Sequence, residues 1–341
     1  MKYRRHGKTD LELSEIGFGT ADNAGLLVKG SERDQLDAIA AAIEGGVNYF
    51  ETSPSFGRGV AETNLGKAFK ALGVRPHIGT MVEILPDGFA DIGKSLETAL
   101  DGSLERLGLD GVDILICHNM PRKARDVNEP TWQPVTYDDL MGSGLTAFER
   151  IKRAGKARYF GFATELCDPE TVGALLDTGR FDHVNVWYSI VNPTAARRLP
   201  PAVRYGRDYP DYGGIIERAR ANGVGVAAFR ALTGGALSTK IIAEGASARH
   251  PNAGGSYSRN PQQFEPEIVR SRPFAFLETP TRTLPQAVYA YVLANPAVTT
   301  IVAGFSDANH VREALVEVPP LSAAELARVD AVYASNFGLA S

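Results

Sequence analysis

The sequence predicts an α/β protein of the (β/α)8 TIM-barrel class. Eight short apolar segments alternate along the chain with amphipathic segments, which is typical of repeated strand–helix units. The chain has 341 residues, of which 44% are hydrophobic, and this suits one large barrel domain over residues 1–341. An open, doubly wound sheet is the alternative. It would need a Gly-x-Gly-x-x-Gly turn after the first strand, and residues 17–22 do not complete that turn.

The elements can be placed in chain order from their hydrophobic periodicity. The expected strands are Ile16–Thr20, Val47–Phe50, His77–Met81, Val112–Cys117, Ala157–Phe162, His183–Trp187, Val224–Phe229 and Thr299–Ala303. Ser31 is a typical N-cap for the first helix, which carries apolar residues along one face through Glu44. Further helices are expected at 60–71, 92–107, 146–154, 169–177, 215–222, 284–294, 307–315 and 323–335.

Three segments are expected to be long loops, at about 119–138, 192–212 and 245–274. Each follows a predicted strand, and the C-terminal ends of parallel strands share one face of a barrel. We therefore expect all three to roof that face. Loops of this length in a compact domain are usually functional or disordered.

Composition favours a small-molecule substrate over a nucleic acid or a membrane. The formal net charge is -4, which offers no electrostatic attraction to either of those anionic partners. The basic start, residues 1–6, is not followed by an apolar run, so no signal peptide or membrane span is expected. Two cysteines do not suggest a disulfide framework, and a cytoplasmic location is expected. The sequence does not indicate an oligomeric state.

Residues 45–57 are the stretch around which the rest of the chain is organised. The apolar strand Val47–Phe50 runs into the acidic residue Glu51 and then into a series of small residues. A carboxylate at the end of a buried strand is costly unless it has a partner or a function. The C-terminal end of a parallel barrel strand is also where active sites lie.

Four stretches together resemble the aldo-keto reductases over nearly the whole chain. They are residues 46–57 with Glu62 and 65–66, residues 103–118, residues 155–161, and residues 303–306 with Glu313. The resemblance implies a (β/α)8 barrel, nicotinamide-linked carbonyl reduction, and a catalytic tetrad of Asp, Tyr, Lys and His. At those four positions this chain has Glu51, Phe56, Met81 and His118, so only the histidine is kept.

The missing tyrosine and lysine bear directly on the chemistry. In this family the tyrosine gives the proton to the carbonyl, and general acid catalysis typically contributes on the order of 10²–10⁴-fold in rate. Phe56 cannot donate a proton, and Met81 cannot lower the pKa of a neighbour. The chain is therefore either an inactive relative or a site rebuilt for other chemistry.

The resemblance also implies a cofactor, NADP(H) or NAD(H), and residues that bind it. These are Asn185, Phe229, Arg230, Leu232, Gly234, Gly304, Ser306, His310 and Glu313. Phe229 could stack on a nicotinamide, and Gly234 could let the backbone approach a pyrophosphate. His310 stands where many relatives have the arginine for a 2′-phosphate, which lowers the expected affinity for NADP(H).

Other polar residues are expected near the barrel mouth. Glu83 and Glu165 fall just past strand ends, as Glu51 and His118 do, and Trp187 at a strand end is expected to pack or to line the pocket. Carboxylates with a histidine could hold a divalent metal, but one histidine without helical ligand spacing argues against it, so no metal is predicted. The remaining histidines, including those at 6, 77, 183 and 250, are interpreted as structural or surface residues.

Three classes of function remain open. The first is an atypical nicotinamide-dependent oxidoreductase that acts on a small carbonyl or hydroxy compound, with sugar-like compounds included. The second is a redox-neutral dehydratase, lyase or isomerase, and the third is a non-catalytic binding relative. In both enzymatic classes Glu51 and His118 are the expected acid/base pair. Beside Phe56 and Met81, Glu51 has apolar neighbours and no cation, so its pKa is expected to be raised.

Overall fold

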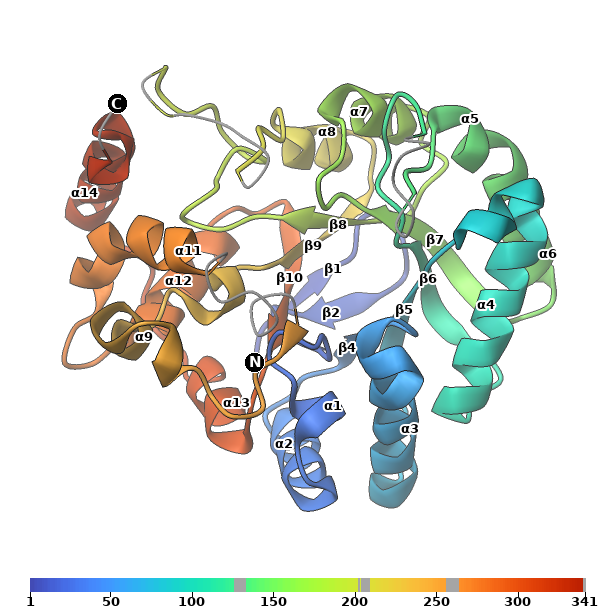
Figure 1. Ribbon diagram of the computed structural model, residues 1–341, viewed down its shortest axis with the longest axis horizontal. Coiled ribbons are helices and arrows are strands. Elements are labelled where there is room, and N and C mark those ends of the chain that lie inside the picture. The colour runs from blue at the N-terminus through green and yellow to red at the C-terminus, as the bar shows by residue number, and fades with distance from the viewer. Residues whose placement is uncertain (126–132, 202, 204–208, 256–263, 340–341) are drawn as a thin grey trace.

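The computed structural model describes residues 1–125, 133–201, 203, 209–255 and 264–339, and its centre is a closed barrel of parallel strands. The strands follow one another around the barrel in the order β10-β3-β4-β5-β6-β7-β8-β9. Because β10 pairs with both β3 and β9, no strand edge is left open. Figure 1 shows the helices arranged around this barrel. The predicted (β/α)8 class is confirmed.

The barrel strands agree with the expected ones to within one or two residues at most ends. They are β3 (Ile16–Gly19), β4 (Tyr49–Thr52), β5 (His77–Val82), β6 (Val112–Cys117), β7 (Ala157–Ala163), β8 (His183–Trp187), β9 (Gly225–Phe229) and β10 (Val298–Gly304). The difference at strand β4 matters most, because this strand begins and ends two residues later than expected and therefore includes Glu51. The backbone N–H of Asn48 donates to the Ser14 hydroxyl instead of joining the sheet.

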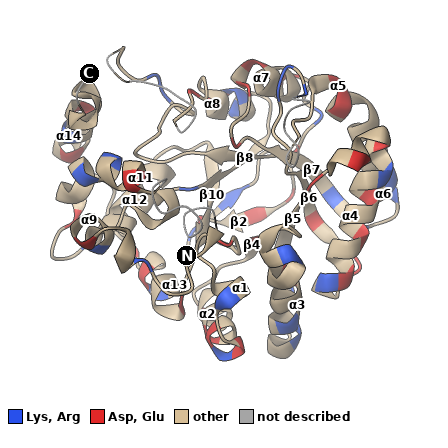
Figure 2. Ribbon diagram, in the orientation of Figure 1, with Lys and Arg blue, Asp and Glu red and all other residues tan. Residues whose placement is uncertain are grey.

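The outer layer consists of the predicted helices, with small changes at their ends. They are α2 (Glu32–Glu44), α3 (Val60–Leu72), α4 (Ile92–Leu107), α6 (Leu145–Arg153), α7 (Pro169–Asp177), α8 (Ile215–Ala221), α12 (Leu284–Leu293), α13 (Ala308–Ala314) and α14 (Ala323–Ala334). The Ser31 side chain accepts from the Asp34 N–H, as expected for the N-cap of α2. Charged residues gather on outer helices such as α4 and α6 (Figure 2).

Several short elements were not predicted. They are the antiparallel hairpin of β1 (Tyr3–Arg5) and β2 (Glu12–Ser14), and the helices α1 (Leu26–Lys29), α5 (Tyr137–Asp139), α9 (Thr239–Glu244) and α11 (Glu265–Ser271). The expectation that 245–274 is a loop is wrong in part, because α11 lies within it and a 3-10 helix at Arg272–Leu277 begins within it. Parts of all three expected loops, at 126–132, 202, 204–208 and 256–263, lie outside the described residues.

Two apolar clusters fill the barrel and the space around it, beside a third one of Ala236, Ile241, Phe264 and Ile268. The larger one lies between the barrel and its helices, and it includes Phe50, Leu65 and Phe160. The smaller one contains Leu11, Leu13, Tyr49, Met81, Ile114, Ile116 and Ala163. Leu11 and Leu13 belong to the N-terminal hairpin, which Figure 1 shows across the centre of the barrel. Among the described residues, no helix is long and apolar enough to cross a membrane.

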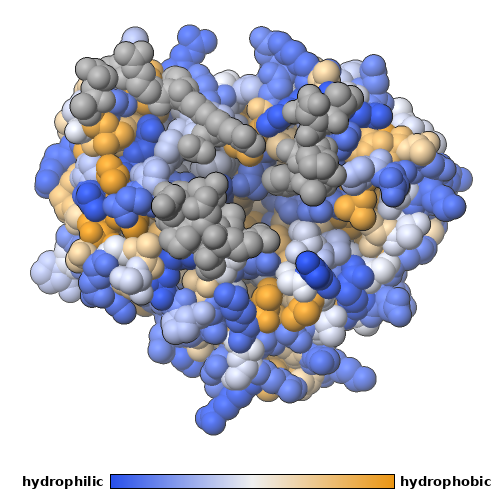
Figure 3. All heavy atoms as spheres, in the orientation of Figure 1, coloured by the Kyte–Doolittle hydropathy of each residue, from blue (hydrophilic) through white to orange (hydrophobic). Residues whose placement is uncertain are grey.

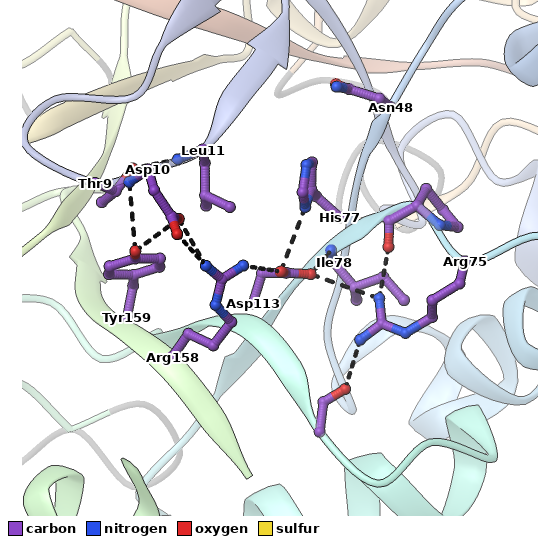
Figure 4. A network of polar contacts seen from close by, with 12 residues as sticks. Thr9, Asp10, Leu11, Asn48, Arg75, His77, Ile78, Asp113, Arg158 and Tyr159 are labelled. Atoms are coloured by element: carbon purple, nitrogen blue, oxygen red, sulfur yellow. Dashed lines mark hydrogen bonds and ion pairs between the residues drawn. The ribbon is translucent and has the colours of Figure 1, made fainter. Parts of the chain in front are cut away.

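A polar network ties the N-terminal hairpin to the start of the barrel strands (Figure 4). Arg158 on β7 donates to both carboxylate oxygens of Asp10 in the hairpin, at 2.6 and 2.7 Å, and to Asp113 on β6 at 3.1 Å. Asp113 also accepts from the backbone N–H of Ile78 at 2.9 Å and contacts Nδ1 of His77 at 3.3 Å. This end of the barrel is therefore held closed by charge-assisted hydrogen bonds.

Candidate active site

A cavity of about 640 Å³ lies at the C-terminal ends of the barrel strands. Its volume is in the range of small-molecule sites in proteins, about 300–1,000 Å³. Glu51, Phe56, Met81 and His118 all line it, so the four positions assigned to the tetrad share one cavity. In the view of Figure 3, the described surface is mostly hydrophilic, and its hydrophobic residues form separate patches.

Glu51 is held by two neutral hydrogen-bond donors. The hydroxyl of Tyr49, two residues earlier on β4, donates to Oε2 at 2.8 Å. The side-chain amide of Asn185, from β8 on the opposite side of the barrel, donates to Oε1 at 2.8 Å. The side chain of Glu51 is thus fixed at both oxygens, and only 2% of the residue is exposed.

Burial sets the protonation of this carboxyl group. It raises the pKa of Glu51 from 4.5 to about 7, against the lowering effect of the Tyr49 and Asn185 hydrogen bonds and of the nearby His118 charge. This is the direction expected from the sequence, although burial rather than the lost cation is the main cause. At neutral pH Glu51 exists in both forms, so it can give or take a proton.

His118 follows β6 and is paired with Glu83, which follows β5. Nδ1 of the imidazole lies 3.1 Å from Oε1 of Glu83. Burial opposes the charge on Glu83, but the hydrogen bond and the charge of His118 hold the pKa of Glu83 below its usual range. Glu83 does not line the cavity, whereas His118 does. A carboxylate behind a histidine orients the ring.

The other two tetrad positions give the cavity apolar walls. The ring of Phe56 meets the ring of His118 edge to face, with centroids 6.1 Å apart. Sδ of Met81 lies 3.4 Å from the Asn185 amide nitrogen, and Met81 is buried. The cavity therefore has no hydroxyl group at 56 and no ammonium group at 81.

Glu165 and Arg230 form a second polar pair in the cavity wall. Nη1 of Arg230, just after β9, lies 2.8 Å from Oε1 of Glu165, just after β7. The guanidinium also lies over the ring of Trp187, 4.1 Å from its centroid. Trp187 is buried beneath this pair and does not line the cavity, although the sequence left that role open.

The residues assigned to a nicotinamide cofactor also line this cavity. They are Asn185, Phe229, Arg230, Leu232, Gly234, Gly304, Ser306, His310 and Glu313. At Gly304 a Cβ atom would lie only 2.9 Å from the Cβ atom of Ala24, so the cavity wall requires a residue without a side chain there. Bare backbone, an aromatic side chain and basic residues in one groove fit a dinucleotide, whose rings need stacking and whose phosphates need donors and positive charge.

A model of the aldo/keto reductase family matches residues 15–334. The chain belongs to this family. L-galactose dehydrogenase of Arabidopsis thaliana is 25% identical, with 94% of this chain and 89% of that protein covered. L-glyceraldehyde 3-phosphate reductase of Escherichia coli K12 is 24% identical, with 97% and 92% covered. The holo structure of aldo-keto reductase AKR11C1 from Bacillus halodurans superposes with a TM-score of 0.71 at 23% identity, covering 98% of this chain and 96% of that one.

Membership identifies the chain as an enzyme of an oxidoreductase family, and NADP(H) or NAD(H) is the cofactor that aldo/keto reductases use. Several of the assigned cofactor residues already have partners within the protein, as Arg230 has in Glu165. Asn185 donates to Glu51, Ser306 donates to the Ala24 carbonyl at 2.8 Å, and Glu313 accepts from Thr283 at 2.6 Å. A cofactor would have to bind beside these bonds or exchange with them.

The structure also brings in residues that the sequence interpretation did not assign to the site. Arg249 and His250 line the cavity from the segment expected to be the third loop, whereas no described residue of 119–138 or 192–212 lines it. Tyr49 lies two residues before Glu51, and His183 lies two residues before Asn185. Side chains two apart on a strand point to the same face, so strand periodicity alone could have placed these pairs together. The described residues contain no group of three or more potential metal ligands.

Proposed function

We propose that this chain is a nicotinamide-dependent oxidoreductase that interconverts a small carbonyl compound and its alcohol, with Glu51 and His118 as the acid/base pair. The observation that carries the proposal is the Glu51 carboxyl group, which lines the cavity and has a pKa of about 7. Glu51 would thereby take over the role of the family's catalytic tyrosine, because it can exchange a proton at working pH. The two relatives are named for L-galactose and L-glyceraldehyde 3-phosphate, which favours a sugar-like substrate.

The proposed reduction is balanced by one hydride and one proton. A bound reduced nicotinamide would supply the hydride to the carbonyl carbon. Glu51 in its protonated form gives the proton to the carbonyl oxygen, and the alcohol leaves Glu51 as a carboxylate. In the oxidation direction the carboxylate accepts the proton of the alcohol. The Tyr49 and Asn185 hydrogen bonds hold the carboxyl group in place in both directions.

As the partner of Glu51 in the proposed pair, His118 would act as the acid that donates a hydrogen bond to the carbonyl oxygen, and it would thereby orient the substrate. Oε1 of Glu83 lies 3.1 Å from Nδ1 of His118, and this contact orients the ring. An N–H group of this ring in the cavity wall would polarise the carbonyl group and stabilise negative charge that develops on its oxygen. The apolar surfaces of Phe56 and Met81 would keep water away from the reacting atoms.

The proposal is tested first by cofactor binding and then by transfer of label. Purified protein is titrated with NADPH and with NADH while the fluorescence of the reduced nicotinamide is followed. The protein is then incubated with a panel of aldoses and small aldehydes and with NADPH or NADH that carries deuterium at C4. We expect saturable binding and deuterium at the carbinol carbon of the product. Binding without label transfer to any substrate of the panel would contradict the oxidoreductase proposal.

A redox-neutral reaction is the second candidate, and a specific observation favours it. The walls at Phe56 and Met81 have no proton donor, while two titratable groups, Glu51 and His118, line the same cavity. Such a pair could remove a proton beside a carbonyl group and help a hydroxyl group to leave. This activity would appear as substrate loss in D₂O with solvent deuterium in the product. The absorbance of added NADPH would then stay unchanged during turnover.

The same proposal places the protein in the cytoplasm with a small molecule as its partner, and not with a nucleic acid or a membrane. The formal net charge of -4 supports the choice of partner, because nucleic acids and anionic lipids would be repelled. Cell fractionation with a labelled chain would test the location. Recovery in the membrane or extracellular fraction would contradict it.

A further inference from the structure

A series of hydrogen-bonded, buried side chains, called the hydrogen-bond chain below, runs across the barrel to Glu51 from the opposite wall. Nε2 of His6 lies 2.9 Å from Nδ1 of His183, and Nε2 of His183 lies 2.8 Å from Oδ1 of Asn185. The Asn185 amide then donates to Glu51 at 2.8 Å. His6 and His183 are both fully buried. His6 comes from the N-terminal hairpin segment, 177 residues away from His183 in sequence.

We infer that His6 and His183 are positioning residues that hold the Asn185 amide in the orientation that donates to Glu51. The inference rests on the proposed role of Glu51 and extends it, because it names the residues that keep this acid/base group in its working state. Neither histidine lines the cavity, so neither is a catalytic residue.

The hydrogen-bond partners determine the proton positions along this chain. An ionised Glu51 can only accept, so Asn185 turns its N–H toward Glu51 and its oxygen toward His183. His183 must then carry its proton on Nε2, which leaves Nδ1 free to accept from His6. His6 must in turn be protonated on Nε2. Every N–H in the chain therefore points toward Glu51, and aligned hydrogen bonds of this kind strengthen one another.

Burial keeps both rings neutral, which this arrangement requires. It lowers the pKa of His183 to about 4, and it lowers the pKa of His6 well below its usual value, helped by the neighbouring His183. A charged His183 would donate from both nitrogens, and His6 would then have to accept at Nε2 instead. The chain thus keeps its direction throughout the range in which Glu51 titrates.

The protein makes space for this arrangement and tolerates a cost for it. A Cβ atom at Gly225 would lie 2.4 Å from Nε2 of His6, so a glycine is needed there for the ring to enter the barrel. Nδ1 of His6 is buried and has no hydrogen-bond partner within the described part of the chain. A buried acceptor without a donor is destabilising. A purely structural role would be served better by an apolar side chain of similar size.

The hydrogen-bond chain of His6, His183 and Asn185 positions Glu51 but does not conduct a proton to or from it. A side-chain amide does not pass a proton on, because its N–H and C=O groups cannot exchange roles without an unstable tautomer. Asn185 therefore separates Glu51 from both histidines. The proton of Glu51 must enter and leave on the cavity side.

Other titratable groups face Glu51 from neighbouring elements. Tyr49 on its own strand donates to it, and burial raises the pKa of that phenol well above its usual value. His118 lies after β6, with Glu83 behind it. Glu165 after β7 and Arg230 after β9 line the same cavity and are paired with each other. None of these groups touches the Asn185 oxygen, so variants of the two histidines test the chain separately from them.

The test follows the carboxyl group of Glu51 directly. The protein is labelled with ¹³C at the glutamate carboxyl carbons, and its NMR signal is assigned with Glu51→Gln and titrated from pH 5 to 9. In His183→Phe the Asn185 oxygen loses its donor, so the amide can turn and present that oxygen to a protonated Glu51. We expect the pKa of Glu51 to rise by about one unit, since a hydrogen bond to a charged group contributes about that much.

His6→Phe should raise the pKa of Glu51 by less, because His183 remains but is no longer held in one tautomer. The matched control is His77→Phe. His77 is another histidine of the barrel, but it contacts Asp113 and takes no part in the hydrogen bonds that run from His6 to Glu51. This control should leave the Glu51 titration in place. If Glu51 titrates at the same pH in His183→Phe as in the unmodified protein, the inference is wrong, whatever the activity.

Two further readouts keep the test decisive. In the unmodified protein, ¹⁵N NMR should show His6 and His183 neutral and protonated on Nε2 from pH 5 to 8. A His183 protonated on Nδ1 would overturn the inference even if His183→Phe failed to fold. If the variants move the Glu51 titration while the pH profile of turnover stays fixed, the positioning chain stands and the proposed catalytic role of Glu51 fails.

Discussion

The barrel buries one carboxyl group near each end, and the two are held in opposite ways. Asp113 lies at the N-terminal end and Glu51 faces the cavity at the C-terminal end, and their exposed fractions are 6% and 2%. Asp113 contacts Arg75, His77 and Arg158 and accepts from a backbone N–H (Figure 4). Within the described part of the chain, Glu51 accepts hydrogen bonds only from the neutral groups of Tyr49 and Asn185.

The difference appears in their pKa values. Burial alone would raise both. At Asp113 the hydrogen bonds from His77 and the Ile78 N–H, with the charges of His77 and Arg75, outweigh burial and lower the pKa to about 2. At Glu51 burial prevails and the pKa rises to about 7. Burial raises the pKa of both carboxyl groups, and the charge of their hydrogen-bond donors decides whether this effect prevails.

The two arrangements fit two tasks. A carboxylate that must stay charged is surrounded by cations, as at the closed end of the barrel. A group that exchanges a proton at neutral pH needs partners that hold its position without fixing its charge. Four experiments can break or sharpen this contrast, taken from the largest expected effect to the smallest.

The largest effect is expected from Glu51→Gln. The variant keeps the shape of the side chain, and rotation of the Tyr49 hydroxyl preserves both hydrogen bonds. Because the titrating group is lost, turnover should fall on the order of 10²–10⁴-fold. The pH dependence of kcat near pH 7 should disappear with it. Steady-state kinetics across pH 5 to 9 on the substrate found by deuterium transfer would measure both.

Asp113→Asn is the matched control at the other end of the barrel. It removes a buried charge of the same kind but lies outside the cavity. Its pH profile of turnover should match that of the unmodified protein. Near-normal turnover in Glu51→Gln across the whole profile would show that Glu51 is structural and that the proposed mechanism is wrong.

The fold was predictable because the barrel leaves a strong pattern in the sequence. Barrel strands are covered on both faces, so they appear as short apolar runs between amphipathic helices. The strands β6 and β8 and the helices α4 and α7 agree with their predicted bounds at both ends. The hairpin of β1 and β2 was missed because its strands have three residues each, too few to show a period. The short helices within the expected loops were missed for the same reason.

The candidate site was predictable only in part. The family resemblance identified Glu51 and His118, and apolar neighbours suggested the direction of the Glu51 pKa. Glu51 was expected just past the strand, because an acid usually marks the end of an apolar run. It lies within β4 because Tyr49 and Asn185 satisfy it inside the barrel. The contact of His6 with His183 spans 177 residues, and no local pattern predicts it.

The second effect concerns stability. The pKa of Glu51 is raised from 4.5 to about 7 in the folded protein, so its contribution is fully present below pH 4.5 and is lost as the pH rises through 7. The loss amounts to about 3 kcal/mol at about 1.36 kcal/mol per unit. Glu51→Gln does not titrate, so it should gain stability relative to the unmodified protein between pH 5 and 8. Urea unfolding of both proteins at pH 5 and pH 8 measures their free energies of unfolding. A difference between the two proteins that does not change with pH would contradict the raised pKa.

The third effect has the opposite sign and a lower pH range. The pKa of Asp113 is lowered from 3.8 to about 2, so its contribution is present above pH 3.8 and is lost as the pH falls through 2. Asp113→Asn should therefore cost about 2 kcal/mol at pH 6, and this cost should shrink toward pH 3. Urea unfolding at pH 6, 4 and 3 provides the measurement. Asp10→Asn serves as a surface control in the same network and should cost less. A cost that stays constant with pH would mean that Asp113 acts by packing alone.

The smallest effect is expected when Glu51 is given a cationic neighbour, as Asp113 already has. Met81→Lys places an ammonium group where Sδ now lies 3.4 Å from the Asn185 amide, close to Glu51. A neighbouring cation favours the carboxylate, so the pKa of Glu51 should fall by about one unit or more. Met81→Leu keeps the volume without the charge and should leave the pKa at about 7. The ¹³C titration described above measures both variants, and an unchanged value in Met81→Lys would show that burial outweighs a direct cation.

Adding Phe56→Tyr to Met81→Lys restores the tyrosine and lysine that the family resemblance implies. If NADPH still binds, this double variant should gain reductase activity on simple aldehydes, with the tyrosine as proton donor. Binding without any gain would mean that the cavity itself, and not only its proton donor, has diverged from carbonyl reduction.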